Sequence, residues 1–234
     1  MENLLNDLVS RLRGDYPDDL LSVILYGSAA SGEYHEKFSD LNVLVVLKQV
    51  GVRELARGRE TVHWWQKQNQ PLPLFLAREE IENANDVFPI EFLDIQHNHR
   101  ILHGEDLAAK ITIDTRQHRA QLEHELRSSL LRLRGRFLGL QQDKGDVARL
   151  MLDSVSTFAT LFRHALILGG AAAPVKKREI FGAAAERFGI SPEPFVNLLT
   201  AREQNRKLAD TEILPLFEAY LEGITRMAEA VDKL

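Results

Sequence analysis

The feature that most constrains this chain is a pair of short apolar, β-branched runs joined by small and polar residues. The runs are LSVILY, residues 21–26, and NVLVVL, residues 42–47. Such runs are typical of buried strands. A helical pattern over 52–68 then leads to a third strand-like run, LPLFLA, at 72–77. Strands that alternate with helical segments predict an α/β domain.

The pattern changes near Thr115, because apolar residues then recur at helical spacing with almost no strand signal. Each apolar stripe must be buried against another element. The sequence therefore predicts an α/β domain over residues 1–114 and an all-α bundle of about five helices over residues 115–234. We expect a substrate cleft between them, since pockets prefer domain interfaces. The run FPIEFLDI, residues 88–95, fits either a strand or a helix.

Composition narrows the classes of function. The 234 residues include no cysteine, which excludes disulfides and thiolate metal sites. The formal net charge of -5 disfavours a dedicated nucleic-acid binder. No apolar run is long enough to span a bilayer, and the N-terminus lacks the pattern of a secretory signal. We therefore expect a cytoplasmic protein without a membrane partner, and a homo-oligomer stays open.

The residues that point to chemistry lie at the junctions of the first two predicted strands. Gly27 and Ser28 end the first strand, and a glycine there lets the backbone approach a ligand closely. Backbone N–H groups at a helix start favour phosphate oxygens. The second strand is expected to begin around Ser39, so that Asp40 and Asn42, as alternate residues, face the same side. This arrangement indicates phosphate contact, although an ordinary strand-to-helix turn fits Gly27 and Ser28 as well.

This pattern resembles the nucleotidyltransferase superfamily of the aminoglycoside and minimal types. The family signature is an apolar strand, Gly-Ser, a spacer of about this length, and then Asp-apolar-Asp; Gly27, Ser28 and Asp40 match it. The resemblance implies transfer of a nucleoside monophosphate from a nucleoside triphosphate to a hydroxyl of a small molecule or protein. It further implies that Gly27 and Ser28 hold the triphosphate. Asp40 and Asn42 stand where the family's catalytic, metal-binding carboxylates stand.

The chain departs from the family pattern in two places. Asn42 replaces the second Asp, and the run at 72–77 lacks the third carboxylate. Magnesium prefers hard, anionic oxygen ligands, so we expect Mg²⁺ with the triphosphate to be held weakly or not at all. Glu91 and Asp94 are the nearest later carboxylates, but the sequence does not place them. The alternative is a catalytically inactive pseudoenzyme that binds a nucleotide or a partner.

Three other groups invite a functional interpretation. Trp64 and Trp65 in a predicted helix favour a core role over base stacking. The histidines around residues 97–103 fit no standard zinc spacing, so a solvated, irregular stretch is expected. Arg119 and His124 match the Arg-x4-His spacing of HEPN ribonuclease bundles. Glu123 lies at ion-pair spacing, however, and the acidic net charge opposes a nuclease, so a salt-bridged surface is expected.

Overall fold

The computed structural model describes residues 1–30, 40–83, 89–111, 113–140 and 144–234. The chain divides into two compact units, Met1–Gln117 and His118–Leu234. Each unit is described by itself below. The domain boundary expected between residues 114 and 115 stays a prediction.

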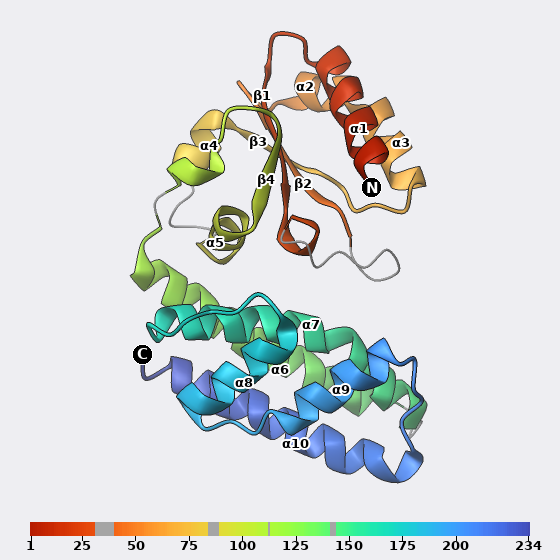
Figure 1. Ribbon diagram of the computed structural model, residues 1–234, viewed down its shortest axis with the longest axis vertical. Coiled ribbons are helices and arrows are strands. Elements are labelled where there is room, and N and C mark those ends of the chain that lie inside the picture. The colour runs from red at the N-terminus through yellow and green to blue at the C-terminus, as the bar shows by residue number, and fades with distance from the viewer. Residues whose placement is uncertain (31–39, 84–88, 112, 141–143) are drawn as a thin grey trace. The chain divides into compact units, whose positions relative to one another are not determined.

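The first unit is built on a mixed four-stranded sheet with the strand order β3-β2-β1-β4. Strand β1 pairs antiparallel with both β2 and β4, and β2 pairs parallel with β3. Figure 1 shows the sheet with helices on both faces. In chain order the elements are α1 (Glu2–Asp15), β1 (Leu20–Tyr26), the 3-10 turn η1 (Gly27–Ala29), β2 (Asn42–Leu47), α2 (Val52–Arg57), α3 (Arg59–Lys67), β3 (Leu74–Ala77), α4 (Arg78–Asn83), α5 (Pro89–His97), β4 (His99–Gly104) and the 3-10 turn η2 (Ala108–Lys110).

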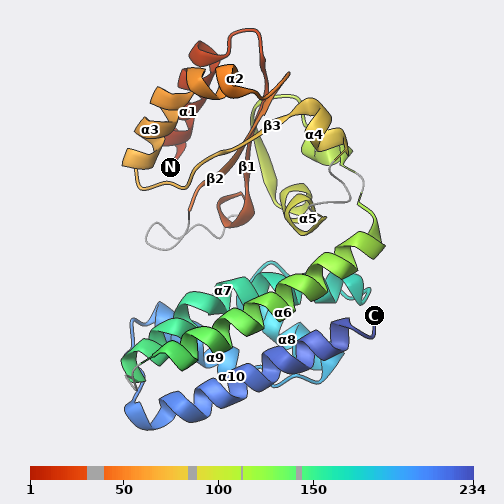
Figure 2. The ribbon, with the colours of Figure 1, turned by 180° about the vertical axis from the view of Figure 1, so that it is seen from behind.

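The two faces of the sheet are covered by different helices, as the front and back views both show (Figure 1 and Figure 2). Side chains that alternate along β1 and β2 enter two separate apolar clusters. The first cluster joins Leu25 and Val45 to α1 and to Trp65 of α3. The second joins Ile24 and Leu44 to α4 and α5. The sheet is thus buried on both faces, which explains why β1 and β2 are almost continuously apolar.

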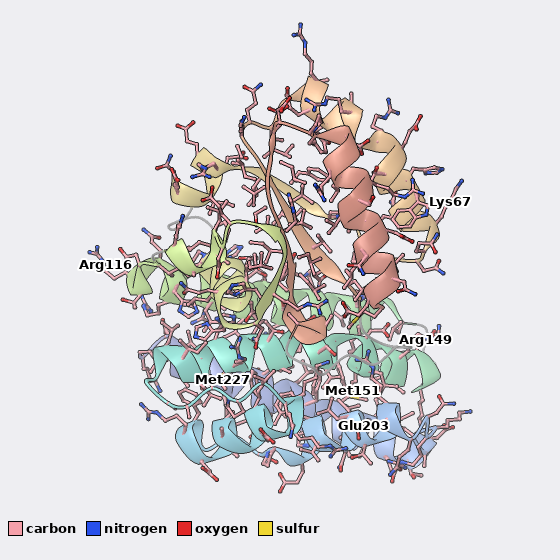
Figure 3. The ribbon with its side chains drawn as sticks, turned by 45° about the horizontal axis from the view of Figure 1, so that its top comes forward. Lys67, Arg116, Arg149, Met151, Glu203 and Met227 are labelled. Carbon is pink, nitrogen blue, oxygen red and sulfur yellow. The ribbon has the colours of Figure 1, made fainter. Side chains whose placement is uncertain are left out.

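The second unit is helical throughout its described residues. Its core is aromatic: Phe158 and Phe195 each pack against Tyr220, with ring centroids 5.7 Å and 5.0 Å apart. Met151 of α7 and Met227 of α10, labelled in Figure 3, are fully buried within this unit. Five helices carry the predicted apolar stripes: α6 (Thr115–Gly139), α7 (Lys144–Leu168), α8 (Lys177–Phe188), α9 (Glu193–Glu203) and α10 (Asp210–Val231).

The predicted fold class, an α/β domain followed by an all-α bundle, is confirmed, and several local expectations are corrected. The ambiguous run at 88–95 lies mostly in helix α5, Pro89–His97. The stretch around residues 97–103, expected to be irregular, contains strand β4. None of the helices in the described ranges is long and apolar enough to cross a membrane.

The helix expected over residues 52–68 breaks into α2 and α3 at Gly58. Tyr16 lies at this break: its hydroxyl accepts a hydrogen bond from the Gly58 N–H, and a Cβ at Gly58 would collide with it. That hydroxyl donates a hydrogen bond to the carbonyl oxygen of Glu54 at 2.8 Å. The buried tyrosine therefore fixes where one helix ends and the next begins.

Candidate functional site

The turn after β1 has a backbone that only glycine adopts readily. Gly27 has φ +78°, in the left-handed region. Its N–H donates a hydrogen bond to the carbonyl oxygen of Asn98 at 2.9 Å, and its own carbonyl accepts one from the N–H of Ala30 at 3.0 Å. A Cβ at Gly27 would lie 3.3 Å from Nδ2 of Asn42. The backbone conformation therefore favours glycine here, and a side chain would also press on the Asn42 amide. The side chain of Ser28 lies outside the described residues.

The first residues before and within β2 bring a carboxylate and an amide to the same end of the sheet. Strand β2 begins at Asn42, two or three residues later than expected, and Asn42 pairs with Tyr26 of β1. Asp40 is exposed just before the strand, and Asn42 is half-buried. Leu41, between them, is buried in the α1/α3 cluster, and its N–H donates to Oε1 of Gln70 at 3.0 Å. Residues 31–39, including Ser39 and most of the spacer of the motif, lie outside the described part of the chain.

Three polar residues lie side by side across three strands at this end. Tyr26 pairs with Asn42 on one side and with His99 on the other. Tyr26 packs against the α4/α5 cluster, and paired residues on neighbouring strands share a face. Asn42, Tyr26 and His99 therefore form a polar row on the α5 face, next to the Gly27 turn.

The Glu91 carboxylate, which the sequence did not place, influences the pKa of Tyr26 in this polar row. Burial raises the pKa of the Tyr26 hydroxyl, and the negative charge of Glu91 adds to that increase. Glu91 stands in the first turn of α5 and is exposed. Its helical position could not be predicted while the run at 88–95 was ambiguous, so its proximity to Tyr26 was missed.

His99 is held on both sides of its ring. Its Nδ1 lies 3.1 Å from the carbonyl oxygen of Gln96, and its Nε2 lies 3.2 Å and 3.3 Å from the two carboxylate oxygens of Asp106. Asp106 also accepts a hydrogen bond from the N–H of Ala109 at 3.0 Å. The Ala109 N–H, followed by His99, holds the pKa of the Asp106 carboxyl below its ordinary value. This pair was not foreseen, because neither residue belongs to a recognisable motif.

Among the residues that the structure describes at the start of β2, the donors available to a metal ion are one carboxylate and one amide, from Asp40 and Asn42. Strand β3, Leu74–Ala77, contributes no acidic side chain. Over residues 1–30, 40–83, 89–111, 113–140 and 144–234, no three His, Asp or Glu side chains lie close enough to share a metal ion.

The other candidates from the sequence have structural roles. Trp65 is fully buried and its Nε1 donates to the carbonyl oxygen of Pro71 at 2.8 Å, whereas the partly buried Trp64 stacks on Arg11. The predicted core role is thus confirmed for Trp65, and Trp64 packs at the edge of the same cluster.

The Arg-x4-His pair in α6 lies on an exposed, ion-paired surface. Arg119 is in an ion pair with Glu123, with 3.6 Å between Nη1 and Oε2, and Glu123 also binds Arg127. His124 is exposed, with Nε2 3.5 Å from the hydroxyl of Ser128. The expected salt-bridged surface is confirmed.

Comparisons with known proteins agree with the motif and the fold. Residues 5–100 match the family model described as "Nucleotidyltransferase domain". That match spans β1, the Gly27 turn, β2, β3 and the start of β4. Residues 5–100 are therefore similar to a nucleotidyltransferase domain, as the resemblance predicted.

Two individual proteins are similar to the chain in different ways. A stretch of 59 residues is 35% identical to a "putative protein adenylyltransferase" of Methanocaldococcus jannaschii, covering 25% of this chain and 40% of that relative. The solved structure of spectinomycin adenyltransferase from Enterococcus faecialis with ATP and spectinomycin has a TM-score of 0.64 over 99% of both chains, at 14% identity. This second likeness shows that the fold, including the helical region, is shared.

Proposed function

We propose that the chain binds a nucleoside triphosphate at the Gly27 turn and transfers its nucleoside monophosphate to a hydroxyl acceptor through a weakened metal site. The observation that carries this proposal is the Gly27 turn itself, with its left-handed backbone beside the amide of Asn42. A backbone without a side chain allows phosphate oxygens to approach its N–H groups. The relatives whose names specify adenylyl transfer support ATP as the nucleotide and a small molecule or protein as the acceptor.

The weakened metal site follows from the donor set. Asp40 and Asn42 fit one weakly held Mg²⁺, whose remaining ligands come from phosphate and water. They do not fit a two-metal centre, which needs several carboxylates. When Mg²⁺ is bound, it would neutralise charge on the phosphates.

The transfer itself is a substitution at phosphorus. The acceptor oxygen forms a bond to the α-phosphorus, the bond from that phosphorus to pyrophosphate breaks, and the acceptor proton passes to a base or to solvent. Gly27 would contribute by orienting the phosphates. Tyr26 and Glu91 lie near enough to the turn to orient an acceptor, although neither is assigned as the base.

Calorimetry with a non-hydrolysable ATP analogue tests nucleotide binding. We expect weak binding, with a free energy of about -6 kcal/mol or weaker and little dependence on Mg²⁺. Gly27→Ala should weaken binding about tenfold or more, because a side chain is strained at this backbone angle and meets Asn42. Gly14→Ala is the matched control, since a Cβ there meets nothing within 4 Å.

Two results would contradict the proposal. Tight, magnesium-dependent binding would show a complete metal site. Equal binding by Gly27→Ala and Gly14→Ala, with both variants folded by circular dichroism, would show that the turn does not hold the nucleotide.

A second candidate function is an inactive nucleotide- or partner-binding pseudoenzyme, and Asn42 favours it. The amide Nδ2 faces the Gly27 turn, where it can donate a hydrogen bond that an aspartate cannot. Pyrophosphate release from ATP in the presence of spectinomycin or a protein acceptor distinguishes the two functions. Release above that of Asp40→Ala supports transfer, whereas nucleotide binding without release supports the pseudoenzyme.

A further inference from the structure

The Gly27 turn is anchored to the first residues of β4. The Gly27 N–H donates to the carbonyl oxygen of Asn98 at 2.9 Å, and the next residue, His99, pairs with Tyr26 in the β1–β4 ladder. The conformation of the turn therefore depends on where residues 98 and 99 are held. Figure 1 shows β4 beside β1, directly after α5.

The His99 ring joins three segments of the chain that meet at this anchor. Its Nδ1 faces a carbonyl oxygen at the end of α5, and its Nε2 faces the Asp106 carboxylate, which also caps the N–H of Ala109. Both groups facing the ring are acceptors. A ring protonated on both nitrogens donates to both of them, whereas a neutral ring donates only one hydrogen bond.

We propose that His99, held by Asp106, is a positioning residue that keeps the Asn98 carbonyl in place and so fixes the Gly27 turn in its nucleotide-binding conformation. Loss of either of the two ring contacts therefore loosens the turn. The effect of His99 on nucleotide binding rests on the proposed function. Its effect on the conformation of the Gly27 turn does not.

The titratable groups around the ring come from each neighbouring element. Asp106 belongs to the segment after β4 and stays ionised near neutral pH, because its pKa is held below the ordinary value. Tyr26 lies opposite on β1, and Glu91 of α5 acts on Tyr26. Arg100, the next residue, pairs with Leu25 and binds Glu2 of α1 at 3.0 Å. The His99 ring is thus bordered by groups from β1, from α5 and from the segment after β4.

Hydrogen exchange of the Gly27 amide in the full chain, followed by NMR, measures the anchor directly. After correction for intrinsic exchange, the wild-type amide should be protected. His99→Gln should exchange about tenfold faster, since it cannot donate to both acceptors. Asp106→Asn should retain part of the protection.

The matched control is His97→Gln. His97 is exposed, and its Nδ1 lies 2.7 Å from the carbonyl oxygen of Leu93 within its own helix. This variant should behave as the wild type does. Unchanged Gly27 exchange in a folded His99→Gln protein would overturn the proposal.

A parallel titration with the non-hydrolysable ATP analogue separates this inference from the proposed function. Faster Gly27 exchange together with weaker nucleotide binding in His99→Gln supports both. Faster exchange in a chain whose wild type binds no nucleotide supports the positioning role and rejects the proposed function.

Discussion

The two faces of the sheet differ in how far their apolar character extends. On the α1/α3 face, apolar side chains continue to the end of the strands and beyond, to Leu25 and Leu41. On the α5 face, Ile24 and Leu44 are buried and apolar, but the next positions are Tyr26 and Asn42. One face therefore serves packing along its whole length, and the other changes from packing to polar groups beside the Gly27 turn.

This difference shows how a strand can carry a site without losing its core. Because side chains alternate with a period of two, one face can change character while the other stays buried. A shift of register by one residue would exchange the two sets. The apolar side chains of β1 and β2 on the α1/α3 face hold the register, and this places Tyr26 and Asn42 on the α5 face.

The largest expected effect tests the packing face. Trp65→Ala removes a fully buried side chain and should lower the free energy of unfolding by about 3–5 kcal/mol. Trp64→Ala is the neighbouring control and should cost clearly less, because Trp64 is only partly buried. Denaturant unfolding followed by circular dichroism measures both. Equal losses would show that the α1/α3 face does not hold the sheet as described.

A smaller effect on stability is expected at the polar end of the other face. Tyr26→Phe removes only a hydroxyl and should change the free energy of unfolding by about 1 kcal/mol or less. If the row contacts a ligand, the same change should alter nucleotide or acceptor binding more than it alters stability. A large loss of stability without a change in binding would make Tyr26 a core residue and break the contrast between the faces.

The smallest effect concerns the pH dependence of stability. Asp106 has a folded-state pKa below its ordinary value, so its ionised form stabilises the fold above that ordinary value. This stabilisation should be lost as the pH falls from about 4 through the lower, folded-state pKa. Asp106→Asn should flatten that acid limb of the stability curve. Identical acid limbs for the variant and the wild type would show that the Asp106 contacts with His99 and Ala109 do not persist in solution.

The sequence predicted the strands and helices whose apolar residues recur at a regular spacing. The apolar runs of β1 and β2 and the helical stripes after Thr115 were sufficient for the fold class. Strand β4 was missed because it is an edge strand with two histidines and an arginine among its six residues, so it lacks the apolar run of a buried strand. Helix α5 was ambiguous because its apolar residues do not separate strand from helix over so short a length.

The sequence predicted the site residues that belong to one continuous motif. It did not predict the residues that other strands and helices bring to the same place. Gly27 and Asn42 were singled out from the motif, and the structure places them beside each other. Their roles in binding stay predictions. His99 and Glu91 come to the same end of the sheet through β4 and α5, and no pattern of one strand indicates that.

The central claim is that Asn42 leaves the site short of one metal-binding carboxylate. Calorimetry of Asn42→Asp with Mg²⁺ and the non-hydrolysable ATP analogue tests it most directly, with Asp40→Ala as the second arm of a double-mutant cycle. The account predicts that Asn42→Asp tightens magnesium-dependent binding and that the gain disappears in the Asp40→Ala background, because the two side chains would share one ion. Unchanged or weaker binding, or a loss of about 1–3 kcal/mol in stability, would contradict it and show that Asn42 serves the Gly27 turn through its amide hydrogens.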